Sequence, residues 1–111
     1  MRIKHRTVGS VTLLDLHGRL TRNDGSGEIR AAVGPLLKQG HVRFLLNLAD
    51  VPYMDSTGVG ELVSVFITVR NHKGTLKLMR LTDRLQKLFE VAQLGKVIEL
   101  FDDEADALQT F

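Results

Sequence analysis

The sequence predicts an α/β fold: a single domain with a mostly parallel central sheet of about five strands and four helices, in the order β-β-α-β-α-β-α-β-α. Strand-like and helix-like apolar patterns alternate along the chain, which is typical of parallel βαβ units. The length of 111 residues suits one domain, so we expect it to span residues 1–111. Hydrophobic residues at 43% and charged residues at 25% are globular values.

The first two elements are predicted to be a pair of strands. Residues 3–7 form a short strand pattern, and residues 11–17 alternate as a second strand. Gly9 and Ser10 between them are turn residues, and Gly18 ends the second strand. We therefore expect the two strands to pair with each other.

The first helix is predicted after a polar loop at residues 22–27. Ser26 is positioned to cap it. The apolar residues at helical spacing are Ile29, Val33, Leu36 and Leu37. Pro35 interrupts this pattern, and an interior proline costs about 3 kcal/mol unless the helix kinks. We expect a bend or a restart at Pro35 and an end at Gly40.

The middle of the chain predicts a buried strand followed by a long helix. Residues 42–48 are dominated by apolar side chains, as in a strand buried on both faces. Residues 57–71 follow as the clearest helix. Its apolar side holds Val59, Leu62, Val63, Phe66 and Val69, and its polar side Glu61, Ser64 and Thr68. Val65 and Ile67 widen the apolar arc to roughly 200°, which indicates a second contact surface, to another helix or to a partner.

The last third of the chain predicts two more strands and two more helices. Residues 75–80 alternate as a strand, and Thr82 or Asp83 can cap the next helix. That helix carries Leu85, Leu88, Phe89 and Ala92 and is expected to end at Gly95. Residues 97–101 read as a short final strand. Residues 102–111 follow as a helix with an acidic first turn, which the helix dipole favours.

Composition excludes several classes of protein. The chain has no cysteine, which removes disulfides, zinc knuckles, iron–sulfur clusters and thiol chemistry. The longest apolar stretch, residues 62–69, is far shorter than the roughly 20 residues that span a bilayer, and no signal peptide is recognisable. We expect a cytoplasmic protein without membrane insertion. A net charge of +2 and 5% aromatics disfavour direct binding of nucleic acid.

Catalytic and cofactor motifs are not found. The four histidines, at positions 5, 17, 41 and 72, have no metal-ligand spacing with another His, Asp or Glu. The chain contains neither a G-x-S-x-G nucleophile elbow nor a Walker A loop. Gly58-Val59-Gly60 begins like a dinucleotide loop, but the third glycine position holds Val63. We therefore expect no cofactor, no metal and no enzymatic activity.

One segment, residues 50–62, combines polar and glycine residues between the most buried strand and the most apolar helix. In open α/β sheets, ligands and partners bind at the carboxyl ends of strands. Oxygens of Asp55, Ser56 and Thr57 can accept the unpaired N–H groups at the helix start. A purely structural interpretation, with one cap and with Gly58 and Gly60 packing closely on the sheet, explains the same residues on spacing alone.

Residues 55–60 with Leu62 resemble the D-S-x-G-x-x-x-L segment of STAS domains, which are named for sulfate transporters and anti-sigma factor antagonists. Residues 44–48 are similar to the buried strand of that family, and residues 77–95 to its downstream strand–helix–glycine pattern. The resemblance runs from about residue 8 to residue 108. A chain of this length is similar to the single-domain anti-sigma factor antagonists of bacteria.

The resemblance implies a regulatory binding protein. In the antagonist family, the serine of D-S-x-G is phosphorylated by a partner that is both anti-sigma factor and kinase. The unphosphorylated antagonist binds that partner and frees the sigma factor. Carried over here, Ser56 is the phosphoacceptor, with Thr57 a poorer one. The partner-binding residues expected are Asp24, Asp55, Ser56, Thr57, Gly58, Glu61 and Val65. The sequence leaves a weak homodimer open.

The sequence also departs from the family pattern. Many antagonists place an acid soon after the glycine that ends the second strand, whereas here Gly18-Arg19-Leu20 is followed by Thr21. The nearest acid is Asp24. STAS domains also serve as scaffolds in stress-signalling assemblies and as small subunits of lipid-transport ATPases. Such a role without a phospho-switch is the alternative function.

Overall fold

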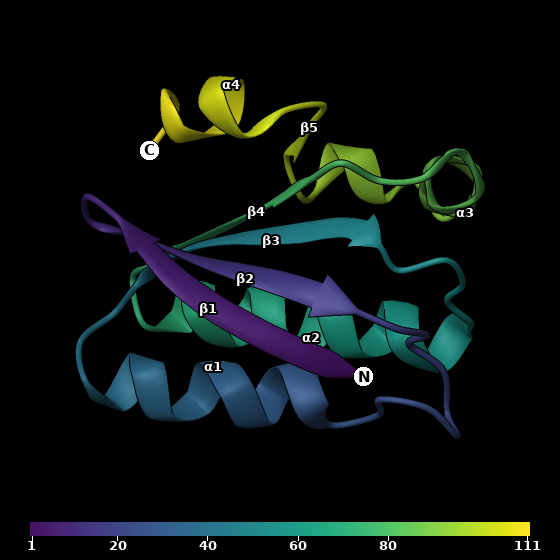
Figure 1. Ribbon diagram of the computed structural model, residues 1–111, viewed down its shortest axis with the longest axis horizontal. Helices are drawn as coiled ribbons and strands as arrows, with labels where there is room; N and C mark the ends of the chain where they lie inside the picture. The colour runs from purple at the N-terminus through teal and green to yellow at the C-terminus, as the bar shows by residue number, and fades with distance from the viewer.

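The computed structural model describes residues 1–111 and contains one five-stranded sheet with helices on both faces (Figure 1). The sheet order follows the chain order, β1-β2-β3-β4-β5. The strands are β1 (Arg2–Val8), β2 (Val11–His17), β3 (Arg43–Asp50), β4 (Thr75–Met79) and β5 (Leu100–Phe101). β1 and β2 pair antiparallel, and every other pairing is parallel. The predicted fold class and element order are confirmed.

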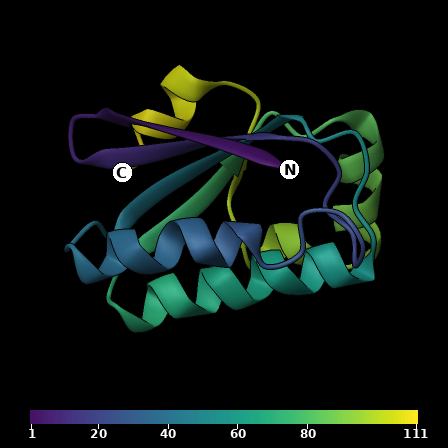
Figure 2. The same ribbon diagram turned by 60° about the horizontal axis from the view of Figure 1, so that its bottom comes forward.

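Three helices pack on one face of the sheet. They are α1 (Glu28–Lys38), α2 (Ser56–Asn71) and α3 (Asp83–Val91), and Figure 2 shows α1 and α2 side by side beneath the strands. Alternate residues of a strand point to opposite faces, so Leu14, Leu46 and Leu78 of neighbouring strands point to this side. They join the main hydrophobic core together with Val33, Leu62 and other side chains of the three helices.

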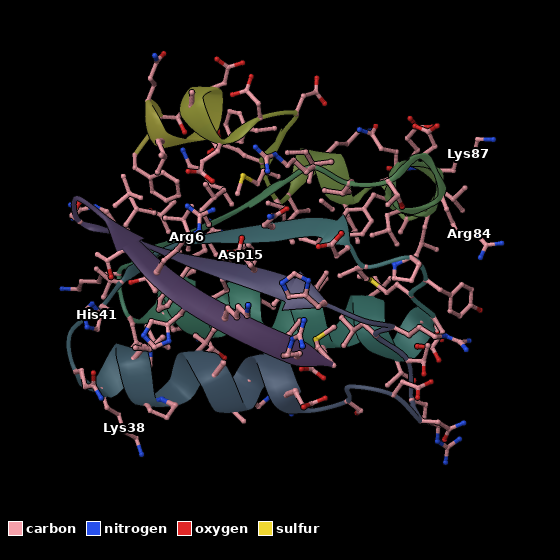
Figure 3. All side chains as sticks on the ribbon, in the orientation of Figure 1. Arg6, Asp15, Lys38, His41, Arg84 and Lys87 are labelled. Carbon is pink, nitrogen blue, oxygen red and sulfur yellow. The ribbon has the colours of Figure 1, made fainter.

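The opposite face has less cover, because only α4 (Glu104–Leu108) lies on it (Figure 1). Leu45 of β3 belongs to a smaller cluster beneath this helix, whereas its neighbours Phe44 and Leu46 lie in the main core. β3 is therefore buried on both faces in its centre, as the sequence predicts. Contacts of two basic side chains, Arg6 and Lys77, hold this layer in place. The Arg6 guanidinium bonds Asp15 and Glu104 (Figure 3 shows the first pair), and Lys77 Nζ donates to Thr110 Oγ1 at 2.7 Å.

The prediction of a bend or restart at Pro35 is wrong, because α1 is one helix from Glu28 to Lys38. The N–H that proline lacks would have bonded the carbonyl of Ala31, which is exposed and can be satisfied by water. The residue before proline normally clashes through its Cβ with the proline ring, but here it is Gly34. Gly40 ends the helix as predicted, with a φ of 93°.

The predicted cap of α1 is also wrong. Gly27 rather than Ser26 occupies the N-cap position, and no side chain of the loop accepts a hydrogen bond there. The predicted strand at residues 97–101 shortens to Leu100–Phe101, because a 3₁₀ turn, η1 (Leu94–Lys96), precedes it and the chain rejoins the sheet late. None of the helices combines the length and the apolar character needed to cross a bilayer.

Candidate functional site

The candidate site lies at the carboxyl ends of β2 and β3, where the loops that leave these strands meet. Leu20 and Met54 form an isolated parallel bridge between the two loops. The Leu20 N–H donates to the Tyr53 carbonyl at 3.0 Å, and the Asp55 N–H donates to the Leu20 carbonyl at 3.3 Å. The two loops thus extend the sheet pairing beyond the strands and fix the position from which α2 starts.

Asp55 caps α2 and joins it to the loop after β2. Its Oδ1 accepts from the Gly58 N–H at 2.9 Å, and its Oδ2 accepts from the Arg22 N–H at 3.0 Å. The hydrogen bond from Arg22, followed by that from Gly58, favours the charged carboxylate and lowers the pKa of Asp55. Of the three oxygen-bearing residues that the sequence offered as caps, Asp55 is the one that caps the helix.

Gly58 allows α2 to approach the loop after β2 closely. A Cβ at this position would lie 2.2 Å from the carbonyl oxygen of Leu20 and 2.7 Å from Cγ of Met54. Both distances are shorter than any real contact, so only glycine fits. Gly60 has no atom within 4 Å of its would-be Cβ, so the close-packing role expected of both glycines belongs to Gly58 alone.

Ser56 and Thr57 are the first two residues of α2, and both are exposed. The capping bond comes from Asp55, so neither hydroxyl is used for that purpose. The first N–H groups of a helix lack partners within the helix, and with the helix dipole they favour negative charge. The Ser56 hydroxyl is thus open to solvent in a place that tolerates a phosphate.

Glu61 and Val65 do not lie on an accessible surface, which contradicts their expected role in binding a partner. Glu61 is 6% exposed, and Val65 is 2% exposed. Val65 packs against α1, where it shares a small cavity with Val33 and Leu37. The wide apolar arc of α2 therefore serves the contact with another helix, and Ile67, at 49% exposure, is the part of it left open.

The Glu61 carboxylate supplies the cap that α1 lacks. Its Oε1 accepts from the Gly27 N–H at 2.5 Å, and its Oε2 accepts from the Ile29 N–H at 3.1 Å and more weakly from Arg30. Its assignment to the polar, outward side of the helix is wrong for this reason. The sequence predicts Ser26 as the cap, so nothing in its spacing pointed to Glu61 as the acceptor.

Asp24 lies in the tight turn of the loop after β2. Its N–H donates to Thr21 Oγ1 at 3.0 Å, and its Oδ2 accepts from the same hydroxyl at 3.2 Å. Its side chain is exposed. The bond between Arg22 and Asp55 places this turn beside the start of α2, so Asp24 shares a surface with the candidate phosphoacceptor.

Sequence reasoning missed a group of side chains beside this site. The guanidinium carbons of Arg19 and Arg84 lie 5.2 Å and 5.3 Å from the centroid of the Tyr53 ring. The three residues come from the loop after β2, the loop after β3 and the first turn of α3. No spacing in the sequence connects three such distant segments. No group of three His, Cys, Asp or Glu side chains is placed to hold a metal ion.

These features define a class of small α/β domain with an exposed serine at the start of a helix, and comparison with known proteins identifies the family. The family model of the STAS domain matches residues 2–107. The chain therefore belongs to the STAS domain family, as the D-S-x-G segment indicates.

Curated relatives carry a more specific name. The anti-sigma-B factor antagonist of Listeria monocytogenes is 35% identical over 89 residues, which cover 73% of this chain and 78% of that protein. The anti-sigma-B factor antagonist of Bacillus subtilis is 40% identical over 72 residues, 65% of each chain.

Solved structures agree with the fold. The phosphorylated form of the Bacillus cell fate determinant SpoIIAA has a TM-score of 0.74 at 22% identity, over 98% of both chains. An anti-sigma factor antagonist from Mycobacterium paratuberculosis has a TM-score of 0.86 at 15% identity and covers 98% of this chain and 92% of that one. At these identities the likeness shows the fold alone.

Proposed function

We propose that this protein is an anti-sigma factor antagonist. It binds an anti-sigma factor while Ser56 is unphosphorylated and so releases a sigma factor for transcription in the cytoplasm. The observation that carries the proposal is the exposed hydroxyl of Ser56, the first residue of α2. The start of this helix is fixed in place by the Asp55 cap and by the close approach of Gly58 to the loop after β2. The names of relatives at 35% and 40% identity support it.

The proposed partner is also the serine kinase that modifies Ser56. A phosphate adds about −1.5 to −2 charges, which the N-terminus of α2 tolerates, so the fold survives the modification. A partner surface that fits a neutral serine tolerates the phosphate less well than the helix N-terminus does. One unit of like charge about 6 Å away, at an effective dielectric constant near 20, costs roughly 3 kcal/mol. That is on the order of a hundredfold in affinity.

The test uses the anti-sigma factor kinase of the same organism. We expect Ser56→Ala to bind it as the unchanged protein does, without being phosphorylated. Ser56→Glu should bind at least tenfold more weakly. Ser10→Ala, at an exposed serine in the turn between β1 and β2, is the matched control that binds and is phosphorylated. Affinity is measured by calorimetry, and the phosphate is mapped by mass spectrometry.

Equal affinity of the unchanged protein, Ser56→Ala and Ser56→Glu would contradict the switch. If the protein instead copurifies with a transport ATPase, and both variants do so equally, the role of a STAS subunit without a phospho-switch replaces the proposal.

A further inference from the structure

Two arginines that lie over the ring of Tyr53 form a cationic group beside the candidate phosphoacceptor. We call Arg19, Tyr53 and Arg84 the arginine stack. The guanidinium carbons of Arg19 and Arg84 lie 5.2 Å and 5.3 Å from the centroid of the Tyr53 ring. Tyr53 precedes Ser56 by three residues, and its carbonyl is held by the loop after β2. Figure 3 shows Arg84 extending from the end of the molecule at which α2 begins.

Neither arginine of the stack has an ion-pair partner within the chain. The ion pairs of the structure use Met1, Arg6, His17 and Lys77 as their cations. Arg6 shows the contrast, because its guanidinium is occupied by Asp15 and Glu104. The carboxylate nearest in the chain to Tyr53, that of Asp55, is engaged by the backbone N–H groups of α2 and of the loop. Arg19 and Arg84 are exposed, and their N–H groups remain free to bind an anion.

Stacking prepares these arginines for binding. A guanidinium that lies over an aromatic ring keeps its plane and leaves its edge N–H groups pointing outward. Less side-chain entropy is then lost when a carboxylate binds to that edge. Arginine and carboxylate also match in shape, because two parallel N–H···O bonds form at once. The stack therefore offers two ordered donors on one surface.

We propose that the arginine stack is the docking site for carboxylates on the surface of the partner, and that it determines which partner binds. This inference rests on the proposed function. Charge complementarity supports the choice of an acidic occupant. The two guanidinium groups of the stack are positively charged, and no carboxylate of the chain pairs with either. A partner with basic side chains is repelled at this place, and a partner with acidic side chains is attracted.

The first experiment needs no partner protein. The full chain, labelled with ¹⁵N, is titrated at low salt with a hexaglutamate peptide, and the Nε–H signals of the arginines are followed. We expect the signals of Arg19 and Arg84 to move, and to return when salt is added. Arg43, an exposed arginine at the opposite end of the sheet, is the internal control. Absence of shifts, or equal shifts at Arg43, would overturn the inference.

The second experiment measures affinity for the anti-sigma factor kinase. Arg19→Gln and Arg84→Gln should each weaken binding about tenfold and slow association, most strongly at low salt, while Arg43→Gln binds normally. Tyr53→Leu should weaken binding similarly while leaving both charges in place. All four side chains are exposed or half-buried, and unfolding midpoints confirm that the variants fold.

The two proposals fail in different ways. If the unchanged protein binds and Ser56→Glu releases the partner, but both glutamine variants bind normally, the docking inference is wrong and the proposed function stands. If the unchanged protein does not bind the kinase, the proposed function is wrong, and the hexaglutamate titration alone decides whether the stack receives carboxylates.

Discussion

The tertiary cap that Glu61 provides can be tested by removing its carboxylate. In Glu61→Ala, the N–H groups of Gly27 and Ile29 lose acceptors at 2.5 Å and 3.1 Å. A hydrogen bond to a charged group contributes about 1.5–3 kcal/mol, and the site is too buried for water to replace it freely. Two such bonds give a loss of roughly 3–6 kcal/mol in the free energy of unfolding. Most domains have only about 5–15 kcal/mol in total.

The loss is measured by urea unfolding followed by circular dichroism at neutral pH. We expect the urea concentration at the midpoint to fall sharply, while the slope of the free energy of unfolding against urea concentration stays constant. Glu61→Gln keeps one carbonyl oxygen and should lose about half as much. Glu90→Ala, at an exposed position of α3, is the matched control and should change stability by less than about 0.5 kcal/mol. If Glu61→Ala and Glu90→Ala are equally stable, the Glu61 carboxylate does not hold the start of α1.

Two further predictions concern packing and pH. Gly58→Ala should lower stability by several kcal/mol, because its Cβ meets a backbone oxygen at 2.2 Å, whereas Gly60→Ala should raise it by about 0.5–1 kcal/mol. Thermal unfolding measures both changes, and effects of the same sign would contradict the close approach of α2 to the loop at Gly58. Hydrogen bonds from Arg6 lower the pKa of Asp15 and of Glu104 below their usual values. The charged carboxylates of Asp15 and Glu104 therefore contribute fully to the free energy of unfolding above their unfolded pKa near 4. This contribution is lost as the pH falls through their lower pKa values in the folded state. Arg6→Gln should flatten this acid dependence in denaturation curves recorded between neutral pH and pH 2, and an unchanged profile would count against it.

The sequence predicts the element order well, because apolar periodicity is local and each strand or helix carries its own pattern. It predicts the site only in part. The choice of Asp55 as cap depends on the Arg22 N–H, 33 residues away, which no spacing reveals. Glu61 reads as a surface residue, because its acceptor role is defined by a helix start 34 residues earlier. The prediction that Val65 contacts a partner is wrong for the same reason, because tertiary packing decides which element covers an apolar residue.

The bond between Glu61 and the start of α1 has a consequence for the order in which the chain folds. An isolated helix of 11 residues is marginal in water, and α1 has no local cap to help it. During synthesis, residues 28–38 leave the ribosome well before residue 61. The helix α1 therefore has no cap until Glu61 of α2 has emerged. A nascent chain that ends before Glu61 therefore holds α1 only transiently, and α1 and α2 become stable in the same step.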